Sequence, residues 1–143
     1  MSHDLRFLIA DDDDDMRAWL KAVLAPLGAK IDEAVDGSDL LWALGSDVAY
    51  TGIIIDEQMP PPYGHLVAGM ARATGLNVPI LVISAWPSED LKLSVAQLES
   101  TQFLPKPLKR EDVVNWCVDS IRSLPGEAHT PESTPTPDET GGN

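Results

Sequence analysis

The chain has 143 residues, 43% of them hydrophobic, which is enough for one domain with a real core and too little for two ordinary ones. Its formal net charge of -13 would repel nucleic acid backbones and anionic lipid head groups, so we expect no direct DNA binding and no membrane partner. A single cysteine, Cys117, excludes an internal disulfide, and the chain starts without a signal-peptide pattern, so we expect a cytoplasmic protein.

The chain begins with an apolar run that leads directly into acidic residues. Phe7–Ala10 predicts a buried parallel strand, and the five consecutive aspartates Asp11–Asp15 follow it. Apolar residues then recur at helical spacing between Met16 and Leu27, which predicts a helix closed by Gly28. Carboxylates this crowded repel one another unless a cation or hydrogen-bond donors compensate them. The strand end is therefore a candidate site.

A second helix and a second acidic strand end come next. Residues 29–35 mix apolar with charged side chains, which predicts a polar strand at a sheet edge. Ser38 is the expected N-cap of a short helix that ends at Gly45. Gly52–Ile55 is continuous and β-branched, which predicts a central strand, and it runs into a carboxylate at Asp56.

The third helix and the fourth strand follow a proline-rich loop, residues 60–64. The helix is expected to turn Leu66, Val67 and Met70 inward and to stop at Gly75. The apolar run at residues 79–83 then predicts a buried strand that ends at a serine, residue 84.

The last part of the predicted domain holds two helices around a short strand. Ser88 is a good N-cap for the first of them. Phe103–Leu104 predicts a short strand that ends near Lys106. The final helix starts near Lys109, a poor cap, and stops before Pro125.

Strands and helices that alternate in this way predict an α/β fold with a doubly wound, five-stranded parallel sheet. We expect one folded domain over residues 1–124. Residues 125–143 contain four prolines and four acids but no Lys or Arg, which is the composition of a disordered tail.

Parallel order places the carboxyl ends of all strands at one edge of the sheet, so five polar side chains are expected to meet there. They are Asp11, Asp12, Asp56, Ser84 and Lys106. Carboxylates with a backbone carbonyl and waters suit Mg²⁺, and an aspartate can attack a phosphoryl group. A cation, a lysine and a hydroxyl would then neutralise the phosphoryl oxygens. The set predicts phosphoryl chemistry on an aspartate.

The order of four motifs resembles that of response-regulator receiver domains, close in pattern to the single-domain chemotaxis receiver. The resemblance covers residues 5–124 and implies the flavodoxin-like strand order 2-1-3-4-5 with helices on both faces. The matching motifs are Phe7-Leu8-Ile9-Ala10-Asp11-Asp12, Ile55-Asp56-Glu57-Gln58-Met59-Pro60 with Gly64, Ile83-Ser84-Ala85, and Phe103-Leu104-Pro105-Lys106-Pro107.

The resemblance also implies roles for individual residues. Asp56 is similar to the phosphoacceptor, and Asp11 and Asp12 to the acidic pair that holds Mg²⁺ together with Asp56. Gln58 would add its backbone carbonyl to the metal.

Three further roles concern the phosphoryl group and the response to it. Ser84 resembles the hydroxyl that contacts the phosphoryl group, and Lys106 the lysine that pairs with it. Phe103 resembles the aromatic switch, and Pro107 would follow a cis peptide bond. Trp86, two residues after Ser84, is large for its position, and we expect it to slow loss of the phosphoryl group.

Simpler explanations remain for several residues. Asp14 and Asp15 are expected mainly to start the first helix, while Asp13 is left open. Packing is the default explanation for Trp19, Trp42 and Trp116. Phe103 is as well explained as plain core, and His65 has no evident partner.

The leading hypothesis is a stand-alone receiver, not an enzyme in its own right, that accepts a phosphoryl group from a histidine kinase or a histidine phosphotransfer protein. It would pass the signal to a downstream protein target. One alternative is a receiver-like interaction module that is never phosphorylated. Another is a phosphatase of the haloacid dehalogenase type, because Asp11 and Asp13 have that family's spacing, although Asp56 would then be unexplained.

Overall fold

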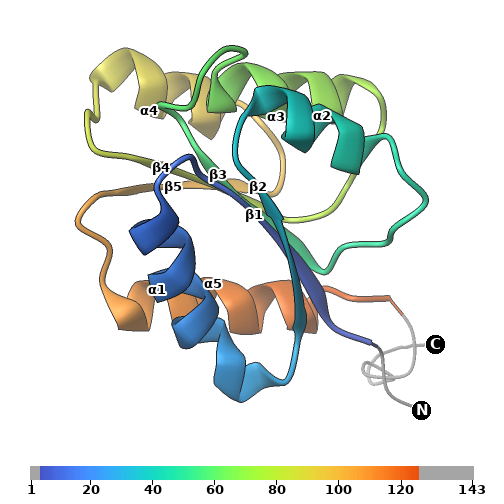
Figure 1. Ribbon diagram of the computed structural model, residues 1–143. Coiled ribbons are helices and arrows are strands. Elements are labelled where there is room, and N and C mark those ends of the chain that lie inside the picture. The colour runs from blue at the N-terminus through green and yellow to red at the C-terminus, as the bar shows by residue number, and fades with distance from the viewer. Residues whose placement is uncertain (1–3, 126–143) are drawn as a thin grey trace, which may run out of the picture.

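The structure, a computed structural model, describes residues 4–125, in which five strands alternate with five α-helices (Figure 1). The strands are β1 (Arg6–Ala10), β2 (Lys30–Ala34), β3 (Gly52–Asp56), β4 (Ile80–Ser84) and β5 (Thr101–Pro105). The helices are α1 (Asp14–Leu24), α2 (Gly37–Leu44), α3 (Gly64–Ala73), α4 (Glu89–Ala96) and α5 (Arg110–Arg122). A 3₁₀ turn, Ala25–Leu27, extends α1. The predicted alternation is confirmed.

All neighbouring strands are parallel and follow the order β2-β1-β3-β4-β5, so β2 and β5 are the edges. This is the flavodoxin-like, doubly wound order that was expected. Ala10 pairs with Ile55 and Ile55 with Val82, so the strands are in step and end at one level. The residues that follow β1, β3, β4 and β5 are therefore brought together.

Helices cover both faces of the sheet: α1 and α5 lie on one face and α2, α3 and α4 on the other (Figure 1). Side chains of successive strand residues alternate between these layers. Leu8 and Ile53 pack on the side of α2–α4, whereas Phe7, Ile9 and Ile54 pack on the side of α1 and α5. Burial on both faces explains why β1, β3 and β4 are almost continuously apolar.

The tryptophans have different environments. Trp116 is 5% exposed, and its ring centroid lies 6.0 Å from that of Phe7. Gly52 leaves room for this pair, since a Cβ there would lie 2.7 Å from the Trp116 ring. Packing was the wrong explanation for Trp42, which is 80% exposed, and Trp19 is only partly covered.

The ends of the helices confirm some predictions and correct one. Asp36, not Ser38, is the N-cap of α2, and its carboxylate accepts a hydrogen bond from Asp39 N. Both residue types can cap, and α2 begins at Gly37, two residues earlier than a cap at Ser38 would place it. Lys109 is the N-cap of α5 and makes no side-chain cap, as expected.

The buried face of α3 includes Val67, as predicted, but differs from the prediction at Leu66 and Met70. Leu66 and Met70 are 50% and 51% exposed, whereas Val67, Ala68 and Ala71 are buried. Small residues on the inner face let α3 lie close to the sheet. The two largest apolar side chains therefore point to the surface.

Two other predictions concern segments at the margins of the fold. Among residues 4–125, no helix is both long and apolar enough to cross a membrane. The expected disordered tail lies outside the described residues, apart from Pro125.

Candidate functional site

The candidate site lies at the carboxyl edge of the sheet, where backbone hydrogen bonds continue one residue beyond three strands. Asp11 N donates to Ala34 O at 3.0 Å, and Glu57 N donates to Ile83 O at 2.8 Å. Lys106 N donates to the carbonyl of Ser84, at the end of β4, at 2.7 Å. These bonds fix the main chain on which the polar side chains of the site stand.

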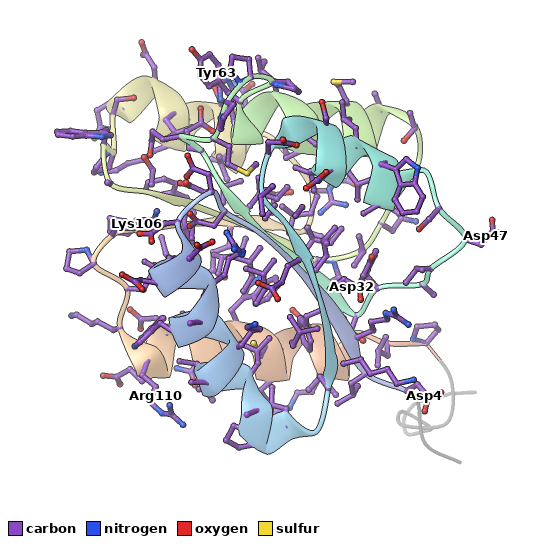
Figure 2. The ribbon with its side chains drawn as sticks, in the orientation of Figure 1. Asp4, Asp32, Asp47, Tyr63, Lys106 and Arg110 are labelled. Carbon is purple, nitrogen blue, oxygen red and sulfur yellow. The ribbon has the colours of Figure 1, made fainter. Side chains whose placement is uncertain are left out.

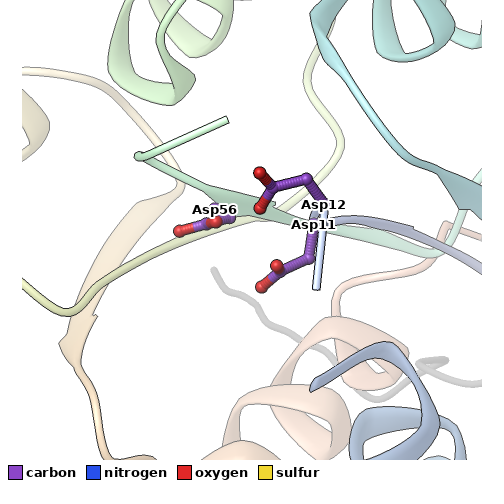
Figure 3. A group of neighbouring side chains, drawn as sticks. All are labelled: Asp11, Asp12 and Asp56. Atoms are coloured by element: carbon purple, nitrogen blue, oxygen red, sulfur yellow. The ribbon is translucent and has the colours of Figure 1, made fainter. Parts of the chain in front are cut away.

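Three carboxylates gather at this edge: Asp11, Asp12 and Asp56, here called the acidic cluster (Figure 3). One oxygen from each lies within 4.8 Å of the others. Asp11 and Asp56 are buried, with 0% and 2% exposure, while Asp12 is exposed. The cluster thus joins two charges in the protein interior to one at the surface.

Lys106 supplies the positive charge that faces the buried pair. Its Nζ lies 3.3 Å from Asp11 Oδ2 and 3.3 Å from Asp56 Oδ1. Only 17% of its side chain is exposed, so the ammonium group is weakly screened by solvent. Lys106 compensates one of two buried negative charges.

The pKa of Asp11 shows the effect of burying a carboxylate whose charge is not fully compensated. Burial raises the pKa of Asp11 to about 6, and a hydrogen bond from Asp13 N, 2.9 Å from Asp11 Oδ1, opposes this rise. The charge of Asp56 raises the same pKa and that of Lys106 lowers it. The cluster is therefore short of positive charge.

A divalent cation fits these residues. The donors are carboxylate oxygens from two adjacent strands, a hard-oxygen set that suits Mg²⁺. Neutralising Asp11 and Asp56 would also remove the penalty that burial imposes on their charged forms. The predicted part of the Gln58 backbone carbonyl in this set remains a prediction.

Ser84 is held in place by its neighbours across the site. Its Oγ donates to the side-chain carbonyl of Gln58 at 3.0 Å and accepts from Trp86 N at 3.0 Å. Ala85 N also donates to that Gln58 oxygen, at 3.3 Å. The Gln58 side chain was not predicted as part of the site, yet it links the loop after β3 to the end of β4.

A second unpredicted contact closes the base of the same loop. Glu57 is buried, and its carboxylate accepts from His65 N at 2.7 Å and lies 2.5 Å from His65 Nδ1. His65 thus has a partner that the sequence did not reveal. Gly64 stands at the closest approach, since a Cβ there would lie 2.8 Å from Asp56 O.

The aspartate run divides between the site and helix α1. Asp13 is the N-cap of α1, with its side chain accepting from Asp15 N, and Asp14 and Asp15 form the first turn. The position of Asp13, left open before, is therefore structural. Capping by Asp13 also counts against a haloacid dehalogenase site, in which this side chain would take part in the reaction.

Phe103 lies in β5 and is partly buried against the core on the side of α2–α4. The Lys106–Pro107 peptide bond is cis, as the resemblance implied. Lys106, which is labelled in Figure 2, directly follows the last residue of β5.

The fold and the site together define a class of signalling domain in which an aspartate at the end of the third strand faces an acidic pair and a lysine. Comparison with known proteins agrees. The sequence model of the response regulator receiver domain matches residues 7–117, and the chain belongs to this family.

Individual relatives are similar to different extents. The response regulator MprA of Mycolicibacterium vanbaalenii is 31% identical over 110 residues, covering 77% of this chain and 47% of that protein. The receiver domain of the Francisella response regulator 1452 has a TM-score of 0.74 at 23% identity, over 83% of this chain and 98% of that one. A CheY-like receiver domain protein of Methanospirillum hungatei has a TM-score of 0.76 at 16% identity, over 83% and 94%. These structures support the fold.

The chain spans about half the length of the curated relatives that it matches. The match therefore establishes a receiver domain. The prediction of a stand-alone receiver without DNA binding stays a prediction.

Proposed function

We propose that the protein is a stand-alone, cytoplasmic receiver that accepts a phosphoryl group on Asp56 from a phosphohistidine of a histidine kinase or phosphotransfer protein. The observation that carries this proposal is the position of Lys106 Nζ, 3.3 Å from carboxylate oxygens of both Asp11 and Asp56. A buried aspartate can act as the nucleophile toward a phosphoryl group, and a lysine beside it can stabilise the charge on the transferred group.

The reaction follows from these residues. A carboxylate oxygen of Asp56 attacks phosphorus, the phosphorus–nitrogen bond of the donor breaks, and the donor imidazole keeps the electron pair and takes up a proton. Lys106 offsets charge on the phosphoryl oxygens, and the Ser84 hydroxyl, after exchanging its bond to Gln58, donates to one of them. Hydrolysis by water later returns Asp56 and inorganic phosphate.

Asp11, Asp12 and Asp56, with the backbone carbonyl of Gln58, would hold Mg²⁺. The ion would supply positive charge next to the phosphoryl oxygens in addition to that of Lys106. This part of the proposal is supported by the raised pKa of Asp11, about 6, which burial causes.

The signal would pass to a downstream protein target through a change at the β5 side of the domain. Phe103 is only partly buried on β5, three residues before Lys106, so an inward movement of its ring is compatible with its surroundings. We propose Phe103 as the residue that couples the state of Asp56 to that surface.

Phosphorylation by acetyl phosphate tests the proposal. Wild type incubated with acetyl phosphate and Mg²⁺ should gain one phosphoryl group by intact mass, and hydroxylamine should remove it, as it does from acyl phosphates. Asp56→Asn should gain none, while Asp47→Asn, at an exposed aspartate outside the acidic cluster, should behave as wild type.

The same experiment distinguishes the alternatives. Omission of Mg²⁺ should suppress labelling of the wild type. Labelling that persists in Asp56→Asn would contradict the assigned acceptor. Complete failure of the wild type to be labelled, by acetyl phosphate or by a phosphorylated histidine donor, would favour a receiver-like interaction module.

A further inference from the structure

A groove of about 630 Å³ lies beside the edge strand β2, and no residue of the acidic cluster lines it. It is lined by residues of β1, β2 and α2 and of the loop of residues 45–51, and is here called the β2 groove. In Figure 2, Asp32 marks β2 and Asp47 marks that loop. None of the proposed phosphoryl-site residues lines it, so the inference does not rest on the proposed function.

The main chain of β2 forms one side of the groove. Ile31 and Glu33 both line it, but the Ile31 side chain packs toward the core at α1 and α5. The Glu33 carboxylate is likewise bound on the α1 side, by Arg17 Nε at 2.8 Å and Lys21 Nζ at 2.9 Å. Ile31 and Glu33 therefore contribute mainly backbone groups to the groove.

The hydrogen-bond pattern of β2 leaves that backbone available. Lys30 N donates to Leu5 O, and Ala34 O accepts from Asp11 N, so the even-numbered residues bond toward β1. In a parallel ladder the alternate residues, 31 and 33, direct their N–H and C=O groups to the other side. No strand among residues 4–125 pairs with β2 there.

The opposite wall presents an exposed aromatic ring. Trp42 of α2 lines the groove and is 80% exposed, the highest value among the exposed large apolar side chains of residues 4–125. An indole left in water at a groove is a typical anchor for a binding partner. Its ring face also attracts Lys and Arg side chains.

The charges of the groove favour a basic occupant. Asp32 forms an ion pair with Arg6, whose Nη2 lies 2.9 Å from Asp32 Oδ1. Asp39, which also lines the groove, forms no ion pair with a Lys or Arg among residues 4–125. Asp36 and Asp47 add negative charge nearby in the chain. A strand-forming segment with basic side chains would meet both the open backbone and this charge.

Two occupants from the protein itself are disfavoured by charge. A second copy would bring another chain of net charge -13 to the same acidic surface. Residues 126–143 contain four acids and no Lys or Arg. We propose that the β2 groove binds an extended, basic segment of another protein, which adds a strand to β2 and places a Lys or Arg side chain against Trp42.

A designed peptide tests this proposal. The probe is a fluorescein-labelled Arg-Val-Arg-Val-Arg-Val peptide, and its anisotropy is followed on titration with the full chain at about 50 mM salt, where screening is weak. We expect a Kd below about 1 mM, weakening as salt is added, and no binding of the Glu-Val-Glu-Val-Glu-Val counterpart.

Matched variants locate the binding. Trp42→Ala, at an exposed side chain, should weaken binding about threefold to tenfold. Trp86→Ala removes an indole that is 75% exposed outside the groove, and should leave binding unchanged. Equal effects of the two substitutions, or none from Trp42→Ala, would overturn the role given to Trp42.

Amide hydrogen exchange tests the added strand directly. The Ile31 and Glu33 amides should exchange rapidly in the free protein and become protected when the Arg-Val peptide binds. Absence of binding at 1 mM protein, or binding without this protection, would refute the proposal. A dimer that forms without peptide and is lost in Trp42→Ala would identify a second copy as the occupant instead.

Discussion

Replacing Asp11 by Asn should stabilise the metal-free protein at pH 7. Burial raises the pKa of Asp11 from 3.8 to about 6. At about 1.4 kcal/mol per pKa unit, a rise of roughly two units corresponds to about 3 kcal/mol of lost stability at pH 7. The pKa of about 6 already includes the attraction of Lys106, and Asn still accepts from Asp13 N, so Asn removes the whole penalty. Burial of its NH₂ group offsets part of this, and we expect a net gain of about 1–2 kcal/mol.

The pH dependence follows from the sign of the shift. Because the folded state holds the Asp11 proton more tightly than the unfolded state, the penalty is complete well above pH 6 and disappears as the pH falls below about 4. At pH 5 about half of it should remain, so the stability difference between wild type and Asp11→Asn should shrink.

Urea unfolding in EDTA at pH 7 and pH 5, followed by circular dichroism, measures both values. The control is Asp12→Asn, which removes an exposed carboxylate of the same cluster and should change stability by no more than about 0.5 kcal/mol. If Asp11→Asn were no more stable than wild type at pH 7, or if its advantage were the same at pH 5, the reasoning from burial would be refuted.

Three further substitutions test other features. Arg72 donates to the main-chain carbonyls of Leu76, Glu99 and Ser100. Arg72→Ala should therefore lower the free energy of unfolding by about 2–4 kcal/mol, whereas Arg110→Ala, at an exposed side chain, should change it little. Gly64→Ala would place a Cβ 2.8 Å from a backbone oxygen and should cost about 1–3 kcal/mol by the same unfolding assay. If the proposed function holds, Trp86→Ala should shorten the lifetime of the phosphorylated protein about twofold to tenfold, measured by intact mass against time, because water gains access near Ser84. An unchanged lifetime would contradict that role for Trp86.

Much of the architecture could be predicted because burial on both faces leaves a clear pattern in the sequence. The continuous apolar runs that became β1, β3 and β4 are typical of strands buried on both faces, and their alternation with helices favours parallel order. Parallel order in turn brought Asp11, Asp56 and Lys106 to one edge. The contacts among these three side chains depend on the register of the strands, which brings the strand ends to one level.

The sequence was less informative where several side chains could fulfil one role. Asp36 and Ser38 are both good caps, and the choice depends on where the preceding turn ends. In α3 the larger residues, Leu66 and Met70, suggested the wrong inner face because small residues allow closer packing.

Long-range side-chain contacts had no periodic signal at all. The Gln58–Ser84 hydrogen bond joins residues 26 apart, and the Glu57–His65 contact spans 8 residues across a proline-rich loop. Each depends on the path of that loop. Residue spacing therefore predicted the charged members of the site but not the neutral side chain that holds the hydroxyl.

The closed base of the loop between β3 and α3 has a consequence for how this domain can diverge. Glu57 binds His65, and Glu57 O accepts from Gly64 N at 3.4 Å, so the ends of the loop are joined independently of its tip. Pro60 and Pro61 are exposed, whereas Pro62 lies against Gly37, where an added Cβ would come within 2.5 Å of its ring. Length changes should therefore accumulate at Pro60–Pro61, and a lineage could alter the tip, and with it a partner's access, without moving Asp56.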